Sequence, residues 1–297
     1  MLEVIERPDP TPSEGELLVR VHAAAVNPTD TTRRAGTARR PAGDPPIVPG
    51  MDVAGVLEEI GPGAETTLKV GDRVMGIVVP NGSHGGYAEK VALPADSVVA
   101  APRDTSHAEA ASLPMNGLTA RLALDTLALP RGGVVAVSGA AGAMGGYAVQ
   151  LAKADGLTVV ADAAEKDVEL VKELGADVVL ERGDEFAARV REKYPDGVDG
   201  AIDGALLHAA FVPALKDGGE IVTVRGYDEP AERGVTFAPI FVGTYAQERA
   251  KLDTLRKQAE KGAVTLRVAA VLPKDEAPEA HRRLEAGGVR GRLVLAL

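Results

Sequence analysis

Residues 134–153 read VVAVSGAAGAMGGYAVQLAK, and the prediction of the fold class starts from this segment. A short run of apolar residues leads into a turn of glycine and alanine, and a helical stretch follows directly. Small residues allow a backbone to approach a pyrophosphate, and the first turn of a helix offers N–H groups with partial positive charge. The stretch therefore predicts a dinucleotide-binding turn, formed by Gly139, Ala140, Ala141, Gly142, Ala143, Met144 and Gly145.

This turn leaves two alternatives open. Ala140 stands where the dinucleotide pattern has its first glycine, so a strand-to-helix turn without a ligand is the other interpretation. Further along, Asp162 lies near the position of an acid that binds the ribose of NAD. Lys166 follows it, and a lysine there would instead meet the 2′-phosphate of NADP. The spacing alone is compatible with either cofactor.

Strands and helices alternate after the turn. The expected strands are continuous apolar runs, which is typical of a parallel sheet covered by helices on both faces. They cover residues 134–137, 158–161, 178–180, 200–203 and 220–224. The sequence therefore predicts an α/β, doubly wound, Rossmann-type parallel sheet.

The remaining segments predict mixed structure. In the first hundred residues, glycine and proline separate short strands, which favours an irregular antiparallel β domain; these strands cover 16–23, 55–61, 70–76 and 87–93. Ser106 and Glu109 have the spacing of a capping box for a helix over 106–113. Residues 33–46 are typical of an exposed loop. The last part predicts helix 245–261, strand 266–272, helix 278–286 and strand 292–297.

Composition excludes several classes of protein. The charge balance over 297 residues is 33 − 43 = −10, which argues against nucleic-acid or anionic-membrane binding. No apolar run reaches the ~20 residues needed to span a bilayer, and the charged N-terminus is unlike a signal peptide. We therefore expect a cytoplasmic protein. The chain has no cysteine and five scattered histidines, so neither disulfides nor a protein-held metal are expected.

Eight short motifs stand in order along nearly the whole chain. They are AVNPTD (25–30), PGMDVAGV (49–56), VGDRV (70–74), GGYAE (85–89), LPMNGLTA (113–120), the glycine turn (139–145), LGAD (174–177) and RGRLVL (290–295). In this order and spacing the chain resembles the zinc-free quinone oxidoreductase branch of the medium-chain dehydrogenase/reductase superfamily.

The resemblance implies an architecture and an activity. Residues 1–117 and 264–297 would form a GroES-like catalytic domain, and 118–263 an inserted Rossmann domain. NADPH, or else NADH, would bind between them and deliver a hydride to a quinone or an α,β-unsaturated carbonyl. The zinc-dependent relatives have Gly-His-Glu where this chain has Gly50-Met51-Asp52, so no zinc is expected. A homodimer would form by pairing edge strands near 235–242.

Residue roles follow from the same resemblance. Asn27 would lie near the nicotinamide, Thr119 near the cofactor phosphates or ribose, and the Gly139–Gly145 turn around the pyrophosphate. Lys166 would pair with the 2′-phosphate. The backbone of Phe241 and Val242 would meet the carboxamide, and either Arg290 or Arg292 would reach the cofactor from the catalytic domain.

The chain also departs from the family pattern. Thr32 replaces a frequent tyrosine, Leu180-Glu181 replaces Asn-Tyr, and relatives carry further residues ahead of Leu2, so a missing first strand or a late start is expected. Tyr87 and His84 are candidate proton donors that also read as structural residues, so no catalytic residue is assigned. A non-catalytic NAD(P)H-binding redox sensor or partner-binding subunit is therefore the alternative function, and a zinc alcohol dehydrogenase is a third.

Overall fold

The computed structural model of the protein describes residues 2–36 and 46–297. Contacts divide the chain into two compact units. The first comprises Met1–Met115, Gly243–Lys261 and Leu266–Leu297, and the second comprises Asn116–Val242 and Gly262–Thr265. This division differs from the expected boundaries at 243–261. That segment packs with the first unit, where the Ser97 hydroxyl donates to the Ala246 carbonyl at 2.7 Å.

The first unit is built on an irregular, mainly antiparallel sheet, as the short strands of the sequence predict. The sheet has seven strands in the order β12-β13-β1-β2-β3-β5, with β4 also paired to β1. The strands are β1 (Glu16–Ala25), β2 (Asp52–Ile60), β3 (Arg73–Ile77), β4 (Lys90–Pro94), β5 (Val98–Ala100), β12 (Val268–Pro273) and β13 (Arg292–Ala296). Alternate residues of β1 and β2, including Leu17, Val19 and Leu57, form its core.

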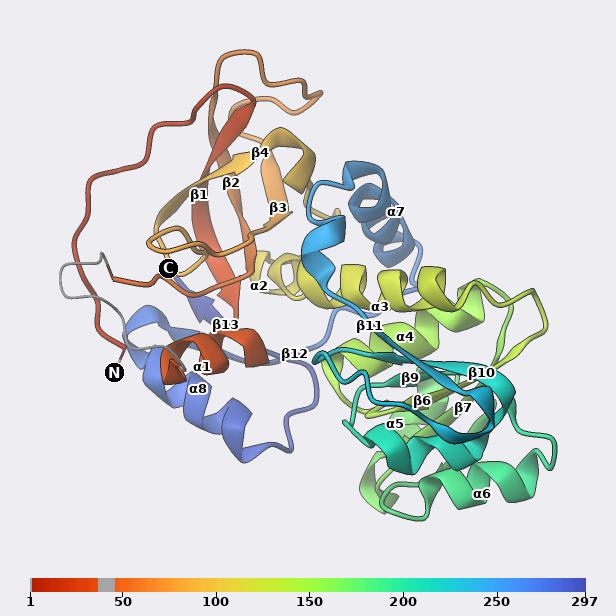
Figure 1. The fold of residues 1–297 in the computed structure, drawn as a ribbon. Helices are drawn as coiled ribbons and strands as arrows, with labels where there is room; N and C mark the ends of the chain where they lie inside the picture. Colours follow the sequence, from red (N-terminus) through yellow and green to blue (C-terminus); the bar gives the residue numbers. More distant parts are fainter. Residues whose placement is uncertain (1, 37–45) are drawn as a thin grey trace. The chain divides into compact units, whose positions relative to one another are not determined.

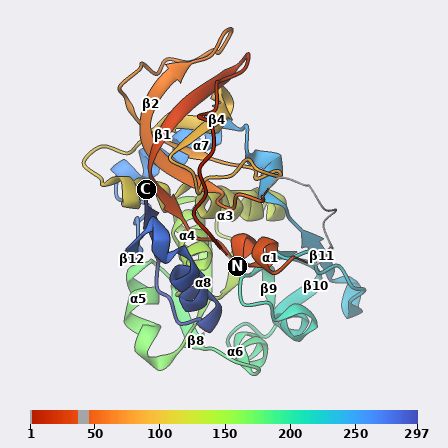
Figure 2. The same ribbon diagram turned by 90° about the vertical axis from the view of Figure 1, so that its left-hand side faces the viewer.

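Both ends of the chain contribute to this sheet. Strand β13 pairs antiparallel with β1 and parallel with β12. Figures 1 and 2 show the same arrangement at the neighbouring helices, where α1 (Pro28–Ala35) lies beside α8 (Ala277–Ala286). The first unit therefore forms only when the C-terminal segment folds back onto the N-terminal one.

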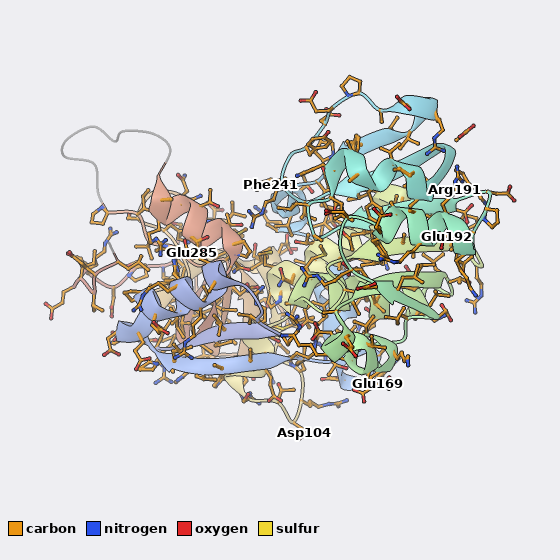
Figure 3. All side chains as sticks on the ribbon, turned by 90° about the horizontal axis from the view of Figure 1, so that it is seen from below. Asp104, Glu169, Arg191, Glu192, Phe241 and Glu285 are labelled. Carbon is orange, nitrogen blue, oxygen red and sulfur yellow. The ribbon has the colours of Figure 1, made fainter. Side chains whose placement is uncertain are left out.

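Part of the expected loop over residues 33–46 is helical. Arg33 and Arg34 form the last turn of α1, and Arg34 makes an ion pair of 2.5 Å with Glu285 of α8, a residue labelled in Figure 3. The expectation of a loop is therefore wrong for residues 33–35, which continue α1, and α8 supplies a carboxylate to Arg34 from a distant part of the sequence. Residues 37–45 of this expected loop, with Arg39 and Arg40, lie outside the described residues.

Two further helices of the first unit were expected from the sequence. Helix α2 (His107–Ala111) begins after Ser106, whose hydroxyl accepts from the Glu109 N–H while the Glu109 carboxylate accepts from the Ser106 N–H. This reciprocal pair is the predicted capping box. Helix α7 (Arg249–Glu260) is shorter than the predicted 245–261, because residues Val242–Tyr245 form a separate 3₁₀ turn, η5.

The second unit is a six-stranded sheet in which every pair is parallel. The strand order is β11-β10-β9-β6-β7-β8, which confirms the doubly wound fold. The strands are β6 (Val134–Ser138), β7 (Thr158–Ala163), β8 (Val178–Glu181), β9 (Val198–Asp203), β10 (Leu215–Thr223) and β11 (Thr236–Pro239). The chain moves outward from β6 to β8 and then returns to β9, so the order reverses between β6 and β9.

Helices cover both faces of this sheet. They are α3 (Pro114–Leu127), α4 (Ala143–Ala154), α5 (Val168–Glu173) and α6 (Phe186–Lys193), with the 3₁₀ segment η3 (His208–Ala214). Figure 1 shows α3 and α4 on one side of the strands and α6 on the other. Phe186 of α6 and Phe211 of η3, both fully buried, pack on each other with ring centroids 5.6 Å apart.

Candidate functional site

The glycine turn lies at the carboxyl end of β6, where the sheet order reverses. Ligands of open α/β sheets bind at such a switch point. Gly139 ends the strand with a φ of +71°, and Gly142 then provides the N-cap of α4 in an extended conformation. The helix points its first turn, with N–H groups that lack intrahelical partners, at the same edge of the sheet.

Gly145 allows α4 to approach the turn closely. A Cβ atom at this position would lie 2.3 Å from the Gly139 carbonyl oxygen and 2.9 Å from the Ala140 Cα. Gly142 has more room, since a Cβ there would meet the same oxygen at 3.1 Å. The backbone cradle therefore depends on glycine at 145, and this fits the role of the last glycine in a dinucleotide turn. The residues present fit a pyrophosphate.

Asp162 stabilises the turn from behind. It lies at the end of β7, is only 6% exposed, and its Oδ1 accepts a 2.9 Å hydrogen bond from the Ala140 N–H. Burial raises the pKa of Asp162, while the N–H groups of Ala140 and Gly139 oppose that rise. Its Oδ1 is thus already committed to a backbone donor of the turn, which the sequence did not reveal.

Asp203 organises the neighbouring strand end. Its carboxylate, fully buried at the end of β9, accepts hydrogen bonds from the Ser138 hydroxyl, the Leu207 N–H and the His208 N–H at 2.8 to 2.9 Å. These bonds connect the end of β6 to the segment after β9. Sequence reasoning missed Asp203, although an aspartate closing an apolar strand just before Gly204 was the available signal.

The other predicted site residues of the second unit lie on separate elements rather than in one turn. Thr119 lies in α3 and is 8% exposed, and Lys166 is exposed on the short 3₁₀ segment η2 (Glu165–Asp167). Phe241 follows β11 with 61% of its surface exposed (Figure 3), and the adjacent Val242 is 6% exposed. The turn residues are therefore the compact part of the predicted site. The contacts assigned to the others stay predictions.

The first unit holds a buried polar cluster around Asp52. Arg292 places Nη2 at 2.8 Å from the Asp52 Oδ2 and 2.6 Å from the Asn27 Oδ1. The Asn27 amide donates to Asp52 at 2.9 Å and to the Ala25 carbonyl, and the Met115 N–H donates to Asp52 at 2.6 Å. All the side chains in these contacts are at least 97% buried. Of the two arginines considered for the cofactor, Arg292 is thus buried in an ion pair.

Asn27 consequently has protein partners on both of its amide atoms. It also precedes α1 as the N-cap residue and exchanges capping hydrogen bonds with Asp30. These contacts give Asn27 a structural role that its sequence motif did not indicate. Contact with the nicotinamide stays a prediction, as does contact through Arg290, a half-buried residue of the loop before β13.

A second group of buried side chains adjoins this cluster. Asp30 accepts from the Gly50 N–H at 2.8 Å and from the Tyr87 hydroxyl at 3.3 Å, and that hydroxyl lies 3.1 Å from Nε2 of His281. Burial raises the pKa of Asp30 to about 6 and the pKa of Tyr87 well above its usual range. Burial lowers the pKa of His281 to about 4. Tyr87 therefore stays protonated and serves as a structural residue.

His84 is also held by the backbone. Its Nε2 lies 2.8 Å from the Ala92 carbonyl, and its main chain forms an isolated β-bridge with Asn81. The imidazole therefore donates to a carbonyl of the same unit, which does not suit it as a proton donor to a substrate.

The residues around Asp52 do not fit a zinc site. Met51 is buried where zinc-dependent relatives would have a histidine, and a guanidinium already balances the Asp52 carboxylate. Among residues 2–36 and 46–297, no group of three His, Cys, Asp or Glu side chains is placed to hold a metal ion. In the same part of the chain no helix combines the length and apolar character of a membrane span.

Comparisons with known proteins agree with this architecture. Residues 13–103 match the alcohol dehydrogenase GroES-like domain, and residues 174–295 match a family described as zinc-binding dehydrogenase. An alcohol dehydrogenase of Geobacillus stearothermophilus is 35% identical over 99% of this chain and 96% of its own. The chain belongs to the medium-chain dehydrogenase/reductase superfamily. Its first unit is thus the GroES-like part and its second the Rossmann part.

Reductases occur among the relatives of this superfamily member. A 2-methylene-furan-3-one reductase of Solanum lycopersicum is 30% identical over 96% of this chain and 73% of its own. A chloroplast envelope quinone oxidoreductase homolog of Arabidopsis thaliana is 33% identical over 75% of this chain and 70% of its own. The protein is therefore an oxidoreductase with quinone and enone reductases among its relatives.

Solved structures with a similar fold include a quinone oxidoreductase and a protein bound to NADPH. A mycobacterial quinone oxidoreductase has a TM-score of 0.82 at 31% identity, covering 99% of this chain and 94% of its own. A mycobacterial protein complexed with NADPH has a TM-score of 0.84 at 30% identity, covering 99% of this chain and 95% of its own. A nicotinamide cofactor therefore agrees with the glycine cradle of the second unit.

Proposed function

We propose that this protein is an NADPH-dependent, zinc-independent reductase that acts on quinones or on α,β-unsaturated carbonyl compounds. The observation that carries the proposal is the Gly139–Gly145 cradle at the switch point of a complete doubly wound sheet. The quinone and enone reductases among its relatives support the class of acceptor.

The residues of the chain have defined tasks in this proposal. The first turn of α4 holds the pyrophosphate with backbone N–H groups, and Asp162 and Asp203 keep the surrounding loops in place. The bound nicotinamide would supply the hydride. Quinones and enones delocalise the developing negative charge over conjugated oxygens, so they need little acid catalysis. This agrees with Tyr87 and His84 being held in structural contacts.

Zinc independence rests on side chains. The chain lacks cysteine, Met51 is buried at the expected ligand position, and Arg292 provides the positive charge next to Asp52. A metal ion placed there would have to displace this guanidinium. Activity without added metal, in protein shown to be metal-free by elemental analysis, is the corresponding check. The cytoplasmic location expected from the sequence stays a prediction.

The main experiment measures oxidation of NADPH and of NADH by the purified full chain with simple quinones and enones. We expect turnover that depends on the acceptor and favours NADPH. Cofactor binding without turnover across the panel would favour the sensor or partner-binding alternative instead. Absence of binding to either cofactor would remove both functions.

We also propose a homodimer formed through β11, which is an edge strand of the Rossmann sheet. An unpaired edge offers backbone groups to a second copy of the chain. Light scattering should then give twice the 30.6 kDa of a single chain. A monomer mass at micromolar concentration would contradict this assembly.

A further inference from the structure

Arg182 lies beside the strand end at which NAD and NADP are distinguished. In the register of the Rossmann sheet, Ala163 at the end of β7 pairs with Glu181 at the end of β8. The next residue, Arg182, donates its N–H to the Ala163 carbonyl at 2.9 Å. Its exposed side chain therefore starts next to the residue that follows Asp162.

Lys166 starts from the same edge of the sheet. It lies on η2, three residues after Ala163, and is exposed like Arg182. Neither cation has an ion-pair partner among the residues that the structure describes. Two positive side chains thus follow the ends of adjacent parallel strands, and two small residues, Ala163 and Ala164, lead from β7 towards Lys166.

Two acids of this edge, Asp162 and Glu181, already have partners. Asp162 faces the glycine turn and bonds to the Ala140 N–H, and the Arg182 guanidinium is close enough to favour its charged form against burial. Glu181, which replaces an expected tyrosine, pairs with Arg189 of α6 at 3.2 Å, and Arg189 also donates to the Glu181 carbonyl at 3.3 Å. The negative charge of Glu181 is therefore offset locally.

We propose that Arg182 is a specificity-determining residue that, together with Lys166, binds the 2′-phosphate of NADPH. The inference rests on the proposed function and names the groups that select its cofactor. An arginine near the end of the second strand accommodates a 2′-phosphate in dinucleotide folds. A guanidinium can donate two parallel hydrogen bonds to a phosphate, while an ammonium acts as a point charge.

The test uses calorimetric titration of the full chain with four ligands: NADPH, NADH, 2′,5′-ADP and 5′-AMP. The adenosine phosphates isolate the 2′-phosphate contact from the nicotinamide. We expect Arg182→Ala to weaken NADPH and 2′,5′-ADP about tenfold, the effect of one charge-assisted contact, and to leave NADH and 5′-AMP within about twofold. Lys166→Ala should act in the same direction, and Arg182→Lys should lie between wild type and Arg182→Ala.

Two further variants give the test matched controls. Lys193→Ala removes an exposed cation of the same unit at the end of α6, and it should leave all four affinities unchanged. Glu165→Gln removes an exposed negative charge beside Lys166, and it should strengthen NADPH and 2′,5′-ADP selectively. Retained NADH affinity in Arg182→Ala shows that this variant is folded.

An unchanged ratio of NADPH to NADH affinity in Arg182→Ala, or an equal loss of both, would overturn the role of Arg182. In that case the wild-type chain would still bind NADPH, so the proposed function would stand. A wild-type chain that binds neither dinucleotide would remove the proposed function, and the inference with it.

Discussion

At the scale of single residues, Arg292 supplies the positive charge that balances Asp52 in the buried cluster of the GroES-like unit. One of its nitrogens contacts both Asp52 and Asn27, and the Asp52 carboxylate also accepts the Met115 N–H. Burial raises the pKa of Asp52, and the guanidinium is the main opposing influence. A buried carboxylate that loses its cation must take up a proton or remain uncompensated, and both are costly.

We therefore expect Arg292→Met to lower the free energy of unfolding by about 3–5 kcal/mol, the usual cost of breaking a buried pair. Urea denaturation at neutral pH measures this loss. The double variant with Asp52→Asn should recover part of it, because no unpaired charge is then buried. A stability equal to that of the wild type in Arg292→Met would show that the pair contributes nothing.

At the scale of elements, α4 can contact the turn that precedes it because Gly145 has no side chain. Gly145→Ala would place a Cβ 2.3 Å from the Gly139 carbonyl oxygen and 2.9 Å from the Ala140 Cα. Both of these are backbone atoms, so no side chain can rotate away to make room. Overpacking of this kind costs about 1–3 kcal/mol. Because the turn must move to relieve the overlap, we also expect NADPH affinity to fall by a factor of ten or more.

Gly200→Ala is the matched control for this variant. It adds the same methyl group on β9, where the nearest atom is a Leu127 methyl at 3.0 Å that can rotate away. Urea denaturation measures the stability of both variants, and calorimetry measures their NADPH affinity. Together they distinguish an effect on the glycine turn from a general effect of an added methyl group. Equal behaviour of the two variants would contradict the role assigned to Gly145.

At the scale of the whole molecule, buried titratable groups make stability depend on pH. Burial lowers the pKa of His281 and that of His107 to about 4. Between pH 6.5 and pH 4 these imidazoles are therefore protonated in the unfolded chain but neutral in the folded chain. Each of these histidines therefore lowers the stability of the folded chain as the pH drops from 6.5 towards 4. Asp30, with its pKa raised to about 6, acts in the opposite direction, as do the buried Asp52 and Asp162, whose pKa values are also raised.

The contribution of one imidazole is isolated by comparing the wild type with a variant that lacks it, at pH 7 and at pH 5. Between pH 7 and pH 5, His281→Gln should lose about 2 kcal/mol less stability than the wild type, since it removes the fully buried imidazole that is protonated only in the unfolded chain. The measurement is the difference between the unfolding free energies at the two pH values for each protein. An identical difference in variant and wild type would exclude His281 as a source of the acid sensitivity.

Spacing along the chain was enough to predict the features that arise from neighbouring residues. The parallel sheet, the glycine turn and the capping box of α2 depend on hydrophobic pattern, on steric room for glycine and on hydrogen bonds within a few residues. Such interactions can be inferred from spacing, because the chain itself brings the groups together. The same reasoning predicted a strand at β13 but not its pairing with β1 and β12.

The contacts of the polar side chains depend on how distant segments fold together, so they could not be predicted from spacing. Asn27 meets Arg292 across 265 positions of sequence, and Asp162 bonds to the turn through the pairing of β6 with β7. Arg182 comes beside Ala163 for the same reason, through the pairing of β7 with β8. A buried carboxylate must find a cation or an N–H donor, and which one it finds is set by how the strands are ordered in the sheet.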